Sequence, residues 1–207
     1  MRIDFGNQAG CKHYMFEEDS IMIIRQTTKD ILASSIIELA KTKSVDTIRV
    51  REITQNCGLT PTTFYRHFQD KYQLLAWIYN QKLEALFSET SGIVTWNQLL
   101  MASCTPLQDN RAFYMNVLKN TAGQTSFRYK ITEYAITLLI NGLKKHNGGK
   151  ALPEDVQFYL KFYMRAMSET VTDWFLEGER IPLEKFTALL GAAMPEPLKP
   201  YLKQNSS

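Results

Sequence analysis

Cysteine, proline and glycine are all scarce in this chain of 207 residues, which contains three, seven and ten of them. Cys11, Cys57 and Cys104 lie far apart and have no thiol or imidazole companion at metal-ligand spacing. This pattern excludes a disulfide framework and a cysteine-based metal site, and it predicts reduced thiols. No apolar run approaches membrane-spanning length, and the N-terminal residues lack a basic-then-apolar secretion pattern. We therefore expect a cytoplasmic protein with no membrane partner.

Residue combinations that perform catalysis are equally hard to find. His13, His67 and His146 have no acidic or thiol neighbour at ligand spacing, and the carboxylates are scattered. The one acidic pair, Glu154-Asp155, is better interpreted as charge that complements a helix N-terminus. The sequence therefore predicts no metal, no cofactor and no enzymatic activity.

Charge of either sign is nearly balanced overall, because 24 basic and 21 acidic residues give a net charge of +3. The basic excess is local. Residues 22–82 contain nine basic and five acidic side chains, whereas residues 83–207 contain thirteen and twelve. An excess of this kind at one end of the chain is typical of a region that contacts phosphate groups.

The sequence between Gly58 and Phe68 predicts a helix-turn-helix. Gly58 follows a candidate helix over 49–56 and suits the left-handed conformation that ends helices. Thr60 is a favourable N-cap, and Pro61 suits the first helical position. Two short helices joined by so few residues around a glycine form this motif, which is common in DNA-binding domains.

The second helix of the motif has chemistry that suits a nucleic acid. Its inward face is expected to contain Phe64 and Phe68, which are four residues apart. Its other faces carry hydroxyl, guanidinium and imidazole groups, which bind phosphates and base edges. The predicted DNA contacts are Arg49, Thr60, Thr62, Thr63, Tyr65, Arg66, His67 and Lys71, with Thr60, Tyr65, Lys71 and Arg49 as candidates for phosphates.

These residues also carry a family resemblance. The segments Thr47–Thr54 and Cys57–Thr60, the run Thr63-Phe64-Tyr65-Arg66-His67-Phe68 and Lys71 resemble the N-terminal domain of the TetR family of bacterial transcriptional regulators. The close match covers roughly residues 27–80. In three places the chain departs from the family pattern: Arg49 stands where a Ser or Thr cap is usual, and Thr54 and Cys57 stand where alanine is commoner.

The rest of the chain reads as helices, with expected spans of 70–88, 95–103, 107–120, 126–146, 153–178 and 182–193. We expect an all-α protein of about nine helices. A three-helix DNA-binding domain over 22–88, including its connecting helix, precedes an antiparallel helical domain over 89–195. Residues 1–21 are interpreted as an arm or leader of unknown role, and residues 196–207 as a loose tail.

The resemblance implies that the second domain binds an effector, either a small molecule or a partner protein. Candidate pocket residues are Trp96, Phe113, Tyr114, Phe127, Tyr134 and Tyr163. Packing in the core is the alternative for each of them. The pattern of Phe113-Tyr114, Gln124–Phe127 and Val171–Gly178 is similar to a subgroup that includes activators of dihydroxyacetone-kinase operons.

Apolar residues cover almost the whole circumference of the segment 154–178, so a single subunit would leave part of it in water. Pairing with a second copy would cover it, and the resemblance implies a homodimer on a double-stranded DNA operator. We expect Phe162 and Phe175 to anchor that interface, with core packing as the alternative. A helical enzyme or protein-interaction module with a purely structural helix-turn-helix is the competing hypothesis.

Overall fold

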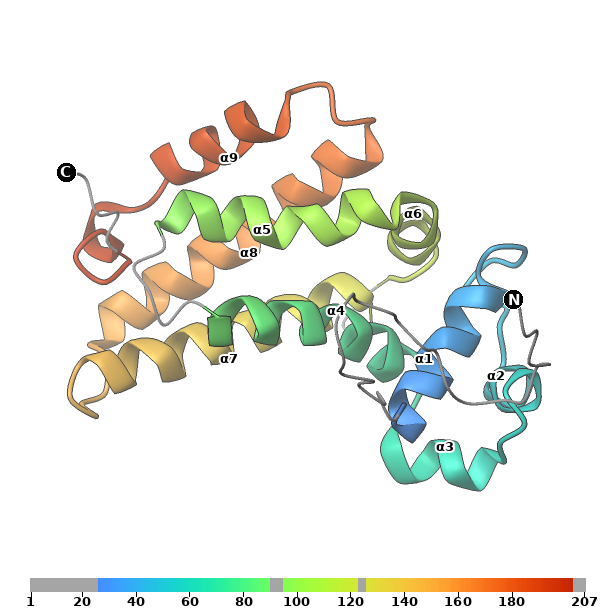
Figure 1. The fold of residues 1–207 in the computed structure, drawn as a ribbon. Helices are drawn as coiled ribbons and strands as arrows, with labels where there is room; N and C mark the ends of the chain where they lie inside the picture. The colour runs from blue at the N-terminus through green and yellow to red at the C-terminus, as the bar shows by residue number, and fades with distance from the viewer. Residues whose placement is uncertain (1–25, 90–94, 123–125, 203–207) are drawn as a thin grey trace, which may run out of the picture.

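The computed structural model describes residues 26–89, 95–122 and 126–202 (Figure 1). Within these ranges the chain forms nine α-helices and one short 3-10 helix, with no strand. The predicted all-α class is therefore confirmed. The predicted arm over residues 1–21 lies outside the described residues.

Three short helices form a separate cluster at one end of the molecule (Figure 1). They are α1 (Thr28–Leu39), α2 (Val50–Asn56) and α3 (Pro61–His67). A capping box starts α1, in which the backbone N–H of Asp30 donates to Thr27 Oγ1 and that of Thr27 donates to Asp30 Oδ2 at 2.8 Å. Fully buried apolar side chains fill the centre of the cluster: Leu32, Ile36, Val45, Ile53, Phe64, Leu74 and Leu75.

A long helix, α4 (Lys71–Glu89), leaves this cluster and enters the second domain, where it packs against α7 (Phe127–His146) and α5 (Trp96–Asp109). The second domain also contains α6 (Arg111–Lys119), α8 (Glu154–Leu176) and α9 (Leu183–Ala192). Helix α8 packs on α6 and α7, while α9 covers α5. Helix α4 therefore contacts helices of both parts and connects them directly.

Two expectations about helix boundaries are wrong. We expected a break between the spans 95–103 and 107–120, but Pro106, which lies in that interval, is inside α5, which continues to Asp109. Its neighbours Cys104 and Leu107 are both buried, so tertiary packing outweighs the hydrogen bond that proline cannot donate. The supposed loose tail also contains structure: Glu196–Leu198 forms a 3-10 helix, and Leu198 and Leu202 are buried against the core.

Candidate nucleic-acid interface

The turn between α2 and α3 depends on Gly58. Its φ of +69° lies in the left-handed region, and no other atom approaches the position of a Cβ within 4 Å. The requirement for glycine here is therefore conformational and has no steric component. The turn is closed by the backbone N–H of Leu59, which donates to the carbonyl of Thr54 at 2.8 Å.

Helix α3 is fixed in place by its first residue and by its inner face. Thr60 caps the helix by accepting the backbone N–H of Thr63 at 3.2 Å, and Pro61 occupies the first helical position. Phe64 and Phe68 are buried, and their rings lie 5.8 Å apart. With this face anchored, the orientation of the remaining side chains is determined.

The outer face of α3 presents most of the groups predicted to contact DNA. Thr62, Arg66 and His67 are exposed, and 59% of the Tyr65 side-chain surface is open to solvent. Tyr65 is one of the large side chains that the described chain leaves exposed. Thr63 differs, because it is half-buried and its hydroxyl lies 2.9 Å from that of Thr60.

A shallow groove lies beside this face and extends the polar surface toward the start of α2. Tyr65 forms one part of its wall, and Arg49 and Arg51 form another. The groove is also lined by Thr47, Gln69 and Tyr72, which the sequence reasoning missed. Thr47 lies just before α2, and Gln69 and Tyr72 lie at the start of α4. Once the helix-turn-helix was assigned, these positions beside it could have indicated that the three residues line the groove.

The side chain of Lys71 has a different role from the predicted one. Its ammonium donates to three backbone carbonyls, of Val45 at 2.8 Å, Asp46 at 2.6 Å and Ile48 at 2.7 Å. An ammonium has three hydrogens, so none remains for a phosphate. The prediction that Lys71 contacts DNA is therefore corrected: Lys71 holds the turn between α1 and α2. Its burial lowers the pKa of the ammonium, and the nearby Asp46 and Glu52 partly oppose that shift.

Arg49 occupies the N-cap of α2 but cannot accept a hydrogen bond there. Half of the capping arrangement survives, since Glu52 Oε2 accepts the backbone N–H of Arg49 at 2.9 Å. The same carboxylate accepts the ammonium of Lys43. These two bonds, with Lys43 the larger influence, lower the pKa of Glu52. The guanidinium of Arg49 is left at the exposed edge of the groove.

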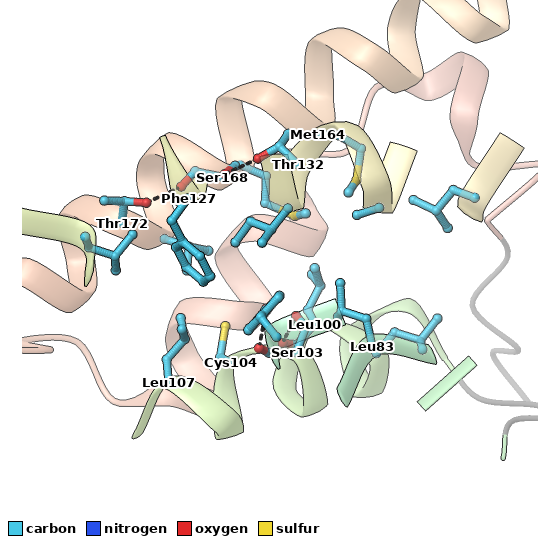
Figure 2. Close-up of a pocket in the computed structure, with 18 of the residues that line it drawn as sticks. Leu83, Leu100, Ser103, Cys104, Leu107, Phe127, Thr132, Met164, Ser168 and Thr172 are labelled. Carbon is cyan, nitrogen blue, oxygen red and sulfur yellow. Dashed lines mark hydrogen bonds between the residues drawn. The ribbon is translucent and has the colours of Figure 1, made fainter. Parts of the chain in front are cut away.

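The second domain contains an apolar cavity of about 110 Å³ between α4, α5, α7 and α8 (Figure 2). Trp96 and Phe127 line it, in agreement with two of the predicted pocket positions. The other four pocket predictions are corrected. Phe113 and Tyr114 are buried core residues outside the cavity, and Tyr163 donates from the core to the carbonyl of Leu190 at 2.6 Å. Tyr134 lies on another surface and donates to Glu84.

The two predicted interface anchors behave differently. Phe175 is fully buried in its own subunit, and the Arg111 guanidinium lies 5.2 Å from its ring centroid. It therefore has no surface to offer a partner, and its assignment to the interface is wrong. Phe162 is 62% exposed on α8, where its ring stacks on that of Phe158, itself 65% exposed.

No group of three or more histidine, cysteine or acidic side chains that could hold a metal occurs among the described residues. In the same residues no helix is long and apolar enough to cross a membrane. The functional features of the described chain are thus a polar helical face at one end and an apolar cavity at the other.

Comparison with known proteins agrees with this division. A profile described as bacterial regulatory proteins of the tetR family matches residues 32–78, and one described as a transcriptional regulator C-terminal region matches residues 94–195. The chain is 28% identical, over 90 residues, to the HTH-type dhaKLM operon transcriptional activator DhaS of Lactococcus lactis subsp. lactis (strain IL1403). That match spans 44% of this chain and about half, 48%, of the relative.

Solved structures share the fold at low identity. A dihydroxyacetone kinase operon activator DhaS superposes with a TM-score of 0.56 and 20% identity, over 84% of this chain and 97% of the other. The fatty acid degradation regulator FadR from Bacillus halodurans gives 0.53 and 16%, over 83% and 96%.

Proposed function

Because the chain belongs to the TetR family of bacterial regulatory proteins, we propose that it is a dimeric transcriptional regulator that binds a specific operator in double-stranded DNA. The observation that carries this proposal is the exposed polar face of α3. Its inner face is anchored by Phe64 and Phe68, so Thr62, Arg66 and His67 are presented on a rigid support. A helix held in this way fits the major groove.

The proposed roles of the side chains follow from their placement. Arg66, which is exposed on α3, has the fork of donors that recognises guanine. Tyr65 and Arg49 at the groove edge are placed for backbone phosphates, and Thr60 and Thr62 offer hydroxyls at the start of the helix. Phosphate contacts set the register of the protein on the duplex, and base contacts supply the specificity.

Dimer formation is supported by apolar side chains that a lone subunit leaves in water. On α8 these are Phe158 and Phe162, and on α9 Leu189 is 51% exposed. Large exposed apolar groups on neighbouring helices are typical of protein interfaces. An isologous pairing through these helices would relate the two copies of α3, the helices that read the DNA, by a two-fold axis. This symmetry suits a palindromic operator.

Control by an effector is supported by the cavity and by the course of α4. Tyr79 and Leu83 of α4 line the cavity, and the same helix begins beside the cluster of α1, α2 and α3, called the DNA-facing cluster below. A molecule that binds differently to two orientations of α4 would shift the spacing of the reading helices.

The test is a selection of bound genomic fragments with the purified protein, followed by titration of the recovered operator at several salt concentrations. We expect affinity to fall steeply as salt rises, because bound phosphates release counterions. Arg66→Ala should weaken operator binding by about 1–3 kcal/mol. Arg180→Ala, an exposed arginine between α8 and α9, is the matched control. Recovery of no preferred sequence would favour the competing hypothesis of a purely structural helix-turn-helix.

A further inference from the structure

The cavity of the second domain has a wall without charge. Among the residues that the structure describes, its lining includes no aspartate, glutamate, lysine, arginine or histidine. Trp96 supplies the one side-chain N–H of the lining, and that N–H already lies 3.2 Å from the hydroxyl of Tyr163, to which it donates. The described wall therefore consists of carbon, sulfur and hydroxyl groups, as Figure 2 shows for ten of its residues.

A wall of this composition discriminates against ions. An ionised carboxylate or ammonium loses its hydration on entry, and the described part of the wall offers no opposite charge to compensate for the loss. The thiol of Cys104 does not change this, since burial raises its pKa to about 11 and keeps it neutral. The described wall therefore disfavours the ionised head groups of fatty acids, phosphorylated metabolites and amines.

Three hydroxyl groups of the wall, those of Ser103, Tyr79 and Thr172, already donate their hydrogens within the protein. Ser103 Oγ donates to the carbonyl of Leu100 at 2.8 Å, and Tyr79 donates to that of Ser103 at 2.8 Å. Thr172 Oγ1 donates to the carbonyl of Ser168 at 2.8 Å. A hydroxyl has one hydrogen and two lone pairs, so these groups retain only their lone pairs for a ligand. A ligand that matches them brings its own donor, such as a hydroxyl.

The size of the cavity limits the ligand further. A protein cavity of about 150 Å³ lined by apolar residues is known to accept benzene. At about 110 Å³ this cavity takes a single ring or a branched chain of similar or smaller size. Met164 and Met167 lie in its wall, and their flexible thioethers adapt to a flat ring and contact it favourably.

From these observations we propose that the cavity binds a small uncharged alcohol or phenol of about six or seven non-hydrogen atoms as the effector of this protein. The hydroxyl of the ligand donates to Ser103 or Thr172, and its carbon skeleton packs among the leucine and methionine side chains. The regulatory part of this assignment rests on the proposed function, whereas the binding part stands on the cavity alone.

The test compares four probes by calorimetry on the full-length protein at neutral pH: phenol, toluene, benzene and isobutyrate, all within the proposed size. Phenol should bind roughly three- to tenfold more tightly than toluene or benzene, which have no donor. Isobutyrate should not bind, because it is ionised. Equal affinity for phenol and benzene would overturn the hydroxyl contact, and binding of isobutyrate or of none of the four would overturn the proposal.

Variants locate the site. The double change Ser103→Ala and Thr172→Val should reduce phenol affinity to that of benzene and leave benzene affinity unchanged. Thr170→Val is the matched control, since Thr170 lies on the exposed side of α8 and donates to the carbonyl of Ala166 in the same manner. If Thr170→Val reduced phenol binding as much as the double change, the assignment to this cavity would be wrong.

A final measurement separates this proposal from the proposed function. Operator affinity is determined with and without saturating phenol. A change in affinity supports the role of the alcohol or phenol as effector, and an unchanged affinity overturns that role. If the ligand-free protein bound no operator at all, the proposed function would be wrong. The binding of phenol to the cavity would still stand, because it does not depend on DNA.

Discussion

The side chain of Asn116 on α6 joins the second domain to the DNA-facing cluster, and its replacement gives the sharpest prediction. Its amide Nδ2 donates to the carbonyls of Ala40 at 2.9 Å and Lys43 at 2.7 Å. Its Oδ1 accepts the backbone N–H of Val45 at 3.0 Å and the side chain of Asn120 at 2.9 Å. Two donors and two acceptor positions are the full capacity of an asparagine side chain.

The cost of Asn116→Leu can be worked out group by group. Leucine has a similar size but leaves three backbone groups of the α1–α2 turn without this partner. Val45 is completely buried, so loss of the bond to its N–H costs about 1–3 kcal/mol. Ala40 is also buried, and its carbonyl adds about 1 kcal/mol. The exposed Lys43 can be hydrated and adds little. The expected total is about 2–4 kcal/mol.

The assay is thermal unfolding followed by circular dichroism and calorimetry. For a chain of this length the loss should lower Tm by about 5–15 °C, and operator affinity should fall because the turn leads directly into α2. Asn141→Leu is the matched control: Asn141 is exposed on α7, and its replacement should change stability by no more than about 0.5 kcal/mol. A Tm for Asn116→Leu within about 2 °C of the parent would refute the reasoning.

Three further predictions concern other contacts. Lys71→Met should destabilise the protein by about 2 kcal/mol or more, because three carbonyls lose a charged donor; a variant of unchanged Tm but weakened DNA binding would restore the phosphate role. Phe162→Glu should give folded monomers in light scattering, whereas Phe175→Glu should unfold the second domain, and a dimeric Phe162→Glu would remove α8 from the interface. In the folded state the pKa of Glu52 lies below its ordinary value of 4.5. The ionised carboxylate of Glu52 therefore stabilises the fold above pH 4.5, and this stabilisation is lost as the pH falls through the folded-state pKa. Glu52→Gln should flatten this part of the acid-unfolding curve, and an unaltered curve would contradict it.

The elements that could be predicted from sequence are those whose causes are local. Thr60, Pro61 and Gly58 determine the start of α3 and the turn before it, and each acts within a few residues of itself. The observed helices of this region therefore begin within one or two residues of the expected positions. The anchored face of α3 also follows from local spacing, since Phe64 and Phe68 are four residues apart.

The errors concern residues whose role depends on distant contacts. Lys71 binds carbonyls 23 to 26 positions earlier in the chain, a relation that no local pattern contains. Phe175 and Phe162 both lie on α8, a helix with apolar residues on nearly all of its faces. Which of the two is buried depends on how α6 and α7 pack on α8. Pro106 favours a helix end in the sequence, but α5 continues through it because the buried residues around it keep the backbone helical.

The hydrogen bonds of Asn116 to the α1–α2 turn form a second connection between the cavity and the DNA-facing cluster, in addition to α4. Phe127 lines the cavity, and its ring lies 5.8 Å from the ring of Tyr114, which precedes Asn116 by two residues on α6. The turn held by Asn116 is also held by Lys71 at the start of α4. A displacement of α6 and a displacement of α4 therefore act on the same turn. Because packed interiors shift between discrete arrangements and do not deform continuously, we expect a small change around Phe127 to alter the turn before α2.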